Sequence, residues 1–137
     1  MKAVHWWPAP AAGEIVWCRF PHNLLGRTPG PKPRPALIVK VSGEEDAPFT
    51  VLVAYGTSQK TTALHSGEFL IDNSDVAAYL LSGLSYPSKF NFRQCVELPY
   101  NDVWFTVPPG APNGQTPKLG VLHPSLMRRA QAAWEAQ

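Results

Sequence analysis

The residues with the clearest capacity for chemistry lie around a proline-rich stretch in the first third of the chain. Between Glu14 and Glu44 the sequence holds five basic residues and no acidic one. They are Arg19, Arg27, Lys32, Arg34 and Lys40. A locally basic surface can bind phosphate groups in a manner that salt screens. The alternative, that these charges only keep a loop soluble, explains the charge pattern equally well.

Arg34 is the basic residue best placed to bind a phosphate. It stands between Pro33 and Pro35, and proline restricts both its own backbone and that of the residue before it. A guanidinium group held in this way can bind a phosphate through two parallel hydrogen bonds. The alternative is a structural arginine that pairs with a carboxylate or with loop carbonyls.

Other polar side chains are positioned to share this chemistry. Thr57 and Ser58 follow a predicted strand and precede Lys60, where hydroxyls and turn N–H groups can hold a phosphate. In an ordinary turn the same hydroxyls bond their own backbone. His22 lies in the loop before Arg34, and imidazole groups titrate near neutral pH, as acid–base catalysis requires. An exposed loop histidine without a catalytic role is the alternative.

The cysteines and histidines do not form a metal site. Cys18 and Cys95 are too few for a disulfide framework or a metal quartet, and each lies in an apolar segment where a free cysteine is usually buried. Cys18 and His22 are four residues apart, but no second pair completes a zinc motif. We therefore expect no metal and no cofactor.

The elements that would position these residues are short and mainly β. Fifteen prolines and ten glycines separate brief runs of β-branched and aromatic residues. The predicted strands are 14–20, 35–42, 49–55, 68–71, 89–98 and 103–107. In 89–98 the alternation places Phe90, Phe92, Gln94, Val96 and Leu98 on one face. Such a pattern predicts a strongly bent antiparallel sheet or partly open barrel rather than a parallel doubly wound sheet.

Two helices and two loops complete the pattern. A helix capped by Asn73 or Ser74 is predicted to run to about residue 82, where Gly83 ends it. A second helix begins at Pro124, with Leu126, Ala130 and Trp134 toward the core. The segments 21–34 and 108–119 are predicted loops. The first is long for a compact domain, and long loops are frequently functional.

The predicted hairpin brings the candidate site residues together. In an antiparallel pair formed by 35–42 and 49–55, the start of the first strand lies beside the end of the second. Arg34 should therefore meet Thr57 and Ser58 in one groove, and the loop that carries His22 leaves from the same edge. This geometry requires only the strand assignment.

Bulk properties limit the class of protein. The 137 residues predict one domain, 1–137, with 1–12 as a candidate mobile segment. Pro8 and Pro10 interrupt the N-terminus, so it does not resemble a signal peptide, and no window approaches 18 apolar residues. We expect a cytoplasmic protein with no membrane segment. The net charge of +2 is too small to indicate nucleic-acid binding alone.

The tryptophans admit two roles. Trp6, Trp7, Trp17 and Trp104 could stack on unpaired bases, each interaction being worth ~1–3 kcal/mol. Trp17 and Trp104 lie in strand patterns and are expected in the core or at an interface. Trp6 and Trp7 have no assigned place, and an exposed pair would indicate contact with a partner.

Several motifs resemble the PemK/MazF-type toxins, the endoribonucleases of bacterial toxin–antitoxin pairs. The matching residues are Gly13, Ile15, Val16, Trp17 and Phe20, then 34–39 (RPALIV), then Thr57 with Ser58, then 119–122 before a helix. The first 60 residues match specifically and the last 20 loosely. The middle, roughly 61–118, matches weakly.

This resemblance implies a mainly β, SH3-like barrel with a C-terminal helix and one or two short helices, assembled as a homodimer. It implies metal-independent cleavage of single-stranded RNA and inhibition of growth. It also implies an antitoxin partner, with which such toxins bind DNA. The catalytic candidates are Arg34, Thr57 and His22. The RNA-binding candidates are Arg19, Arg27, Lys32, Ser58, Lys60, Lys89 and Arg93.

One segment departs from the family pattern. Many members carry an arginine and an Asp or Gln near the position of 88–93, whereas this chain has no acid there before Glu97. Lys89 or Arg93 could supply charge, but a carboxylate base is missing. The sequence therefore leaves open a toxin-like endoribonuclease and a non-catalytic RNA- or protein-binding member of the same barrel family. An SH3-like interaction domain with no nucleic-acid role is a third alternative.

Overall fold

The computed structural model describes residues 3–23, 28–43 and 48–137. The described strands are β1 (Glu14–Cys18), β2 (Arg34–Ser42), β3 (Thr50–Thr57), β4 (Glu68–Ile71), β5 (Ser88–Pro99) and β6 (Lys118–Val121). The described helices are α1 (Val76–Ser82), the 3-10 turn η1 (Pro124–Leu126) and α2 (Met127–Ala136).

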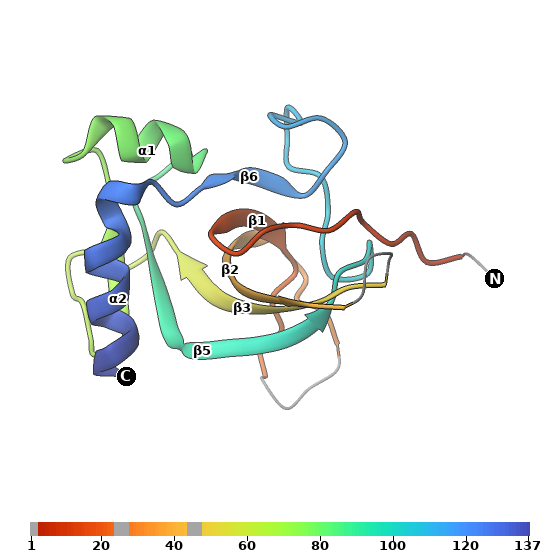
Figure 1. Cartoon of the computed structure of the whole chain (residues 1–137), viewed down its shortest axis with the longest axis horizontal. Helices are drawn as coiled ribbons and strands as arrows, with labels where there is room; N and C mark the ends of the chain where they lie inside the picture. The colour runs from red at the N-terminus through yellow and green to blue at the C-terminus, as the bar shows by residue number, and fades with distance from the viewer. Residues whose placement is uncertain (1–2, 24–27, 44–47) are drawn as a thin grey trace.

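The strands form one six-stranded sheet in the order β4-β5-β3-β2-β1-β6, and every strand pairing is antiparallel. The sheet curls into a half-barrel, with α1 and α2 at one end (Figure 1). The predicted fold class, a mainly β barrel with a C-terminal helix and one or two short helices, is confirmed: the structure is a half-barrel with a C-terminal helix and one other short helix.

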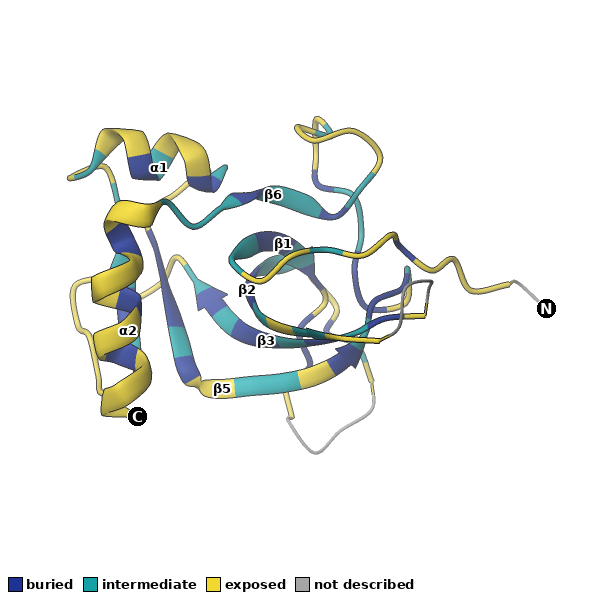
Figure 2. Cartoon of the chain, in the orientation of Figure 1, coloured by how far each residue is buried: buried dark blue, intermediate teal, exposed yellow. Residues whose placement is uncertain are grey.

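Strand alternation divides the core into two clusters. Along β1, Val16 and Cys18 point into the first cluster and Ile15 into the second, as the period of two requires. The first cluster lies inside the curl of the sheet, and the second is covered by α1 and α2. Most of the buried positions lie in the strands, whereas much of α1 is exposed (Figure 2).

A bulge in β5 overturns the single face predicted for 89–98. Ala54 of β3 pairs with Cys95, but the next residue, Tyr55, pairs with Asn91, so 92–94 are extra residues on β5. The bulge switches the inward face. Phe90 and Phe92 therefore pack in the second cluster, while Val96 and Leu98 lie with the first.

The predicted strand 103–107 is wrong, because Asn101 organises a turn there. The Asn101 carbonyl accepts the N–H groups of Trp104 and Phe105, and its side chain accepts that of Val103. These N–H groups are the ones a strand would need for its ladder, and only Phe105 keeps a single bridge, to Cys18. Trp104 and Phe105 are nevertheless buried, so the apolar run serves the core.

The strand at the other edge of the sheet was not predicted, and the predicted loop 108–119 overlaps its first two residues. Lys118 and its successors form β6, which pairs with β1. Gly120 is needed here because a side chain would collide with the backbone of Leu81 and Ser82 at the end of α1. Four residues with a central glycine give too little strand signal to detect from sequence.

The N-terminal segment lies against the turn at 100–105. The Trp7 N–H donates to the Tyr100 carbonyl at 3.1 Å, and the Trp7 indole donates to the Phe105 carbonyl at 3.1 Å. Trp7 is buried and Trp6 is exposed. The two tryptophans therefore do not form the exposed pair that would have indicated a shared partner contact.

The helices differ from prediction in detail. Asp75 caps α1, because its side chain accepts the Ala78 N–H at 3.1 Å, and Gly83 ends the helix with φ of 70° as expected. In the C-terminal helix the buried stripe follows Leu126, Ala130 and Ala133. The predicted core position of Trp134 is therefore wrong: it is 41% exposed, with its ring edge-on to Phe92.

Candidate functional site

The β2–β3 register sets Arg34 beside Thr57. Ala36 pairs with Tyr55, and two residues further along the strands Arg34 and Thr57 occupy the corresponding ends. Gly56 permits this approach, since a Cβ atom there would lie 2.5 Å from the Pro35 carbonyl oxygen. The hairpin geometry therefore places Arg34 and Thr57 together as the sequence predicted.

A basic pocket opens on one side of Arg34. Its volume is about 420 Å³. It is lined by Phe20, Pro21, His22, Gly30, Pro31, Lys32, Arg34, Tyr55 and Gln94. His22 and Lys32 are exposed at its mouth. No acidic side chain is among the described residues that line it, so its charge favours an anion.

A second pocket, which we call the aromatic pocket, opens on the other side of Arg34. Its volume is about 460 Å³. It is lined by Trp17, Pro33, Arg34, Pro35, Gly56, Thr57, Ser58, Gly83, Leu84, Ser85, Tyr86, Ser88, Pro108, Pro109, Pro112 and Leu119. The predicted site residues therefore divide between two adjoining pockets, with His22 and Lys32 in one and Thr57 and Ser58 in the other.

Arg34 joins the two pockets because it lines both. The residue is half-buried. Within 3–23, 28–43 and 48–137, no carboxylate pairs with its guanidinium and no carbonyl accepts from it. The structural alternative for Arg34, an ion pair or a carbonyl contact, is thus not realised by the described residues. No described residue therefore occupies its donors.

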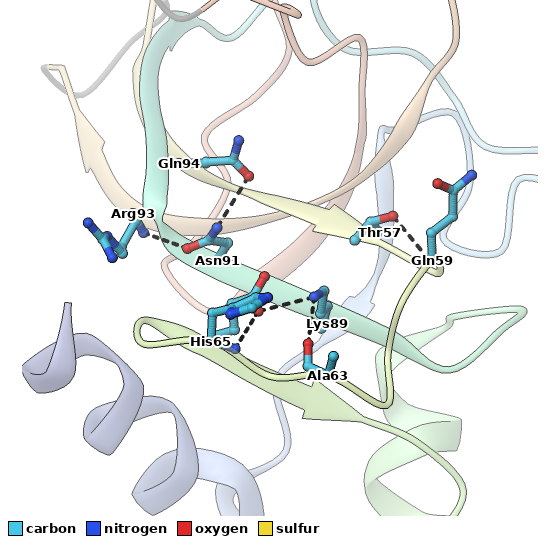
Figure 3. A network of polar contacts seen from close by, with 9 residues as sticks. Thr57, Gln59, Ala63, His65, Lys89, Asn91, Arg93 and Gln94 are labelled. Carbon is cyan, nitrogen blue, oxygen red and sulfur yellow. Dashed lines mark hydrogen bonds and ion pairs between the residues drawn. The ribbon is translucent and has the colours of Figure 1, made fainter.

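Thr57 stabilises a turn at the end of β3, and Ser58 is exposed beside it. The Thr57 Oγ1 atom accepts the Gln59 N–H at 3.1 Å, as in an ordinary turn (Figure 3). Ser58 and Lys60 are exposed, and Lys60 has φ of 52°. Thr57 Oγ1 can still donate its proton, because accepting one hydrogen bond leaves the hydroxyl hydrogen free.

Lys89 is held in a buried ion pair. Its ammonium donates to Glu68 Oε1 at 3.1 Å and to the Ala63 carbonyl at 2.9 Å, and both charged side chains are under 10% exposed (Figure 3). Burial raises the pKa of Glu68, but hydrogen bonds from the His65 N–H and from Lys89, with the Lys89 charge, outweigh it, so the pKa lies below its usual value. We leave Lys89 out of the proposed site.

The remaining basic candidates are Arg19, Arg27 and Arg93. Arg19 and Arg93 are exposed and line neither pocket. Arg27 falls outside the described residues. Cys18 is fully buried, and burial raises the pKa of its thiol, so it is not a reactive group.

Four pocket residues escaped the sequence prediction of the site. Tyr55 and Gln94 line the basic pocket, and Trp17 and Tyr86 line the aromatic pocket. Gln94 reaches its place through the β5 bulge, and Tyr86 reaches its place through the turn after α1. No local sequence pattern predicts that Gln94 or Tyr86 lies in a pocket, because both placements depend on how distant segments pack.

Comparison with protein families decides the class. The model of the PemK-like, MazF-like toxins of type II toxin–antitoxin systems matches residues 11–132. The chain belongs to this toxin family. The match extends across the segment 61–118, where the motif resemblance was weak, and membership implies an antitoxin partner. A search of curated proteins gave no significant match.

Two further observations complete the description of this PemK/MazF-type chain. Among the described helices, none is long and apolar enough to cross a membrane. In the part of the chain that the structure describes, no group of three or more His, Cys, Asp or Glu side chains could hold a metal ion.

Proposed function

We propose that this toxin-family protein is an endoribonuclease that cleaves single-stranded RNA without a metal ion. The observation that carries the proposal is Arg34, a half-buried cation with no described internal partner at the meeting point of two pockets. A charge removed from water is unfavourable unless it is paired. An RNA phosphate would pair it, because the guanidinium fork matches two phosphate oxygens.

The cationic side chains of the basic pocket support binding of the RNA phosphate that Arg34 contacts. Lys32 and His22 lie in it beside Arg34, so a phosphate there meets several cationic or potentially cationic donors. We expect Ser58 and Lys60, which follow Thr57 in the chain and are exposed, to contact the neighbouring phosphate. Arg19 and Arg93 are exposed, and their contacts with the flanking RNA remain predictions.

The reaction uses the ribose 2′-hydroxyl as the nucleophile. Its oxygen forms a bond to phosphorus, its proton passes to a base, and the bond from phosphorus to the 5′-oxygen breaks as that oxygen receives a proton. A cyclic 2′,3′-phosphate and a free 5′-hydroxyl result. DNA lacks the 2′-hydroxyl and should be inert.

The residues divide these tasks by position. Arg34 stabilises the charge that develops on the phosphorane-like transition state. His22 lines the same pocket, and an imidazole suits proton transfer near neutral pH, worth ~10²–10⁴-fold. Thr57 orients the phosphate through its free hydroxyl proton.

A non-catalytic RNA-binding role is the second candidate, and one observation favours it. The described lining of both pockets contains no carboxylate, so the base expected of many family members is missing. In that case the pockets would hold RNA without cutting it. The homodimer and the antitoxin contact belong to the proposal in either case.

Induced expression in a bacterium separates these functions. Wild type should stop growth and fragment cellular RNA, whereas Arg34→Ala should permit growth and leave RNA intact. Lys40→Ala is the matched control, because Lys40 is an exposed cation on the same strand that lines neither pocket. Growth arrest with intact RNA would favour the non-catalytic role. Equal RNA fragmentation by wild type and Arg34→Ala would contradict the proposed site.

A further inference from the structure

The aromatic pocket holds two rings that the phosphate chemistry does not use. Trp17 is half-buried in its wall, and Tyr86 is 69% exposed. Neither ring stacks on another aromatic ring among the described residues. The sequence led us to expect Trp17 in the core or at an interface. Its position in an open pocket beside Arg34 calls for a different role.

The backbone around both rings is fixed. The Trp17 N–H donates to the Pro117 carbonyl at 2.8 Å, and the Trp17 carbonyl accepts the Thr106 N–H at 3.1 Å. The Tyr86 carbonyl accepts the Ser88 hydroxyl at 2.9 Å. Below them, Gly83 brings the end of α1 so close to the Leu119 carbonyl that a side chain could not fit. The backbone that carries both rings is therefore held in place by contacts within the fold.

The lining combines flat apolar walls with hydrogen-bonding groups. The rings of Trp17 and Tyr86 and several prolines supply the walls, while Thr57, Ser58 and Ser85 supply hydroxyls. The Trp17 indole N–H has no hydrogen-bond partner among the described residues, and it is not fully buried from solvent. It can therefore donate to a ligand.

An unpaired nucleobase has the matching chemistry. It is planar, it presents apolar faces to aromatic rings, and its edge carries donors and acceptors. The pocket volume of about 460 Å³ lies within the ~300–1,000 Å³ typical of small-ligand sites. Because Arg34 lines this pocket and the basic pocket alike, a base here would be attached to the phosphate that Arg34 binds.

We propose that the aromatic pocket receives one base of the RNA strand, next to the phosphate on Arg34, with Tyr86 stacking on the base. This inference rests on the proposed RNA function and deepens it. Phosphate contacts carry no sequence information, whereas contacts to a base can. Tyr86 would stack on any base, so the Trp17 indole N–H and the pocket hydroxyls are the groups that would distinguish one base from another at the cleavage point.

Binding of non-cleavable oligonucleotides tests this pocket. The probes are fluorescent single-stranded 2′-O-methyl oligonucleotides: oligo(A), oligo(C), oligo(G) and oligo(U), and an abasic strand of equal length. The abasic strand keeps every phosphate and lacks every base. Wild type, Tyr86→Ala, Tyr86→Phe, Arg34→Ala and Leu80→Ala are compared. Leu80 is the control because it is 74% exposed and lies outside both pockets.

Wild type should bind at least one homopolymer more tightly than the abasic strand. Tyr86→Ala should weaken that binding ~5- to 100-fold, the range of base–aromatic stacking, and leave abasic binding unchanged. Tyr86→Phe should bind like wild type, and Leu80→Ala should have no effect. Arg34→Ala should weaken binding of the abasic strand and the homopolymers alike.

The outcomes separate the two proposals. If Arg34→Ala weakens every probe while Tyr86→Ala behaves like Leu80→Ala, the base pocket is wrong and the phosphate site stands. If Tyr86→Ala weakens abasic and base-containing strands equally, Tyr86 does not contact a base, and the inference fails. If wild type binds no probe, or Arg34→Ala binds like wild type, the proposed RNA function fails and this inference fails with it.

Discussion

Arg34 is the residue at which the sequence pattern and the structure can be compared most directly. Its neighbours Pro33 and Pro35 marked it in the sequence, and the structure leaves its guanidinium without a partner among the described residues. Other charged side chains of the chain have partners within the fold. Lys89 is buried and paired with Glu68, and Asp75 accepts hydrogen bonds from Ala78 and Ser125. A half-buried cation with no partner among the described residues would be stabilised by a bound anion.

His22→Gln tests the acid–base role at this scale. Glutamine keeps a polar side chain but cannot titrate, so RNA cleavage should fall ~10²–10⁴-fold. The affinity for 2′-O-methyl RNA should change little, and the melting temperature should stay the same because His22 is exposed. Cleavage kinetics, fluorescence binding and thermal unfolding give the three readouts.

His65→Gln is the matched control, since His65 is also exposed and lines neither pocket. It should cleave at the wild-type rate. Cleavage by His22→Gln at the wild-type rate would remove His22 from the reaction.

Single strands were predictable where the hydrophobic pattern ran through the segment without interruption. The alternation along 14–18 and the apolar run from residue 35 gave β1 and β2 nearly to the residue. The exceptions have physical causes. Asn101 diverts three N–H groups into a turn, and the bulge at 92–94 depends on pairing with β3. Neither cause is visible in a hydrophobic period.

The ion pair of Lys89 with Glu68 stabilises the pairing of β5 with β4. Lys89→Met leaves the Glu68 carboxylate buried without its cation, which should lower the free energy of unfolding by on the order of 3 kcal/mol at pH 7. Urea unfolding followed by circular dichroism measures this. Lys40→Met, at an exposed position of β2, should have almost no effect.

The same pair predicts a pH dependence. The folded-state pKa of Glu68 is lowered, so its contribution is complete above the ordinary glutamate pKa of about 4.3 and is lost as pH falls through the lower folded pKa. In Lys89→Met the part of this lowering that Lys89 supplies is lost, while the hydrogen bond from the His65 N–H remains. The stability gap between wild type and Lys89→Met should therefore narrow from pH 7 to about pH 3. A gap of constant size would contradict the assigned role of the pair.

For the whole molecule, the sequence predicted the mainly β barrel and the proximity of Arg34 to Thr57. Arg34 and Thr57 could be brought together in advance because a hairpin fixes which strand ends meet. Trp17 and Tyr86 could not, because their meeting depends on packing of the α1–β6 junction through Gly83. The division of the site into two pockets likewise became visible only with the fold.

Homodimer formation is a prediction at this scale, drawn from the family resemblance. Light scattering at micromolar concentration should give a particle of twice the 15.1 kDa chain mass. The exposed side chains of Met127 and Trp134 offer apolar surface that an interface could cover. A particle of single-chain mass across the accessible concentration range would contradict the dimer.

The most direct test of the central claim is cleavage of single-stranded RNA by purified wild type and Arg34→Ala in the presence of EDTA. Wild type should release fragments with a cyclic 2′,3′-phosphate and should not cut DNA of the same sequence. Arg34→Ala should be at least ~10²-fold slower, with an unchanged melting temperature. Equal cleavage by the two proteins would contradict a role of Arg34 in the reaction. A large loss of melting temperature with cleavage retained would show that Arg34 serves the fold instead.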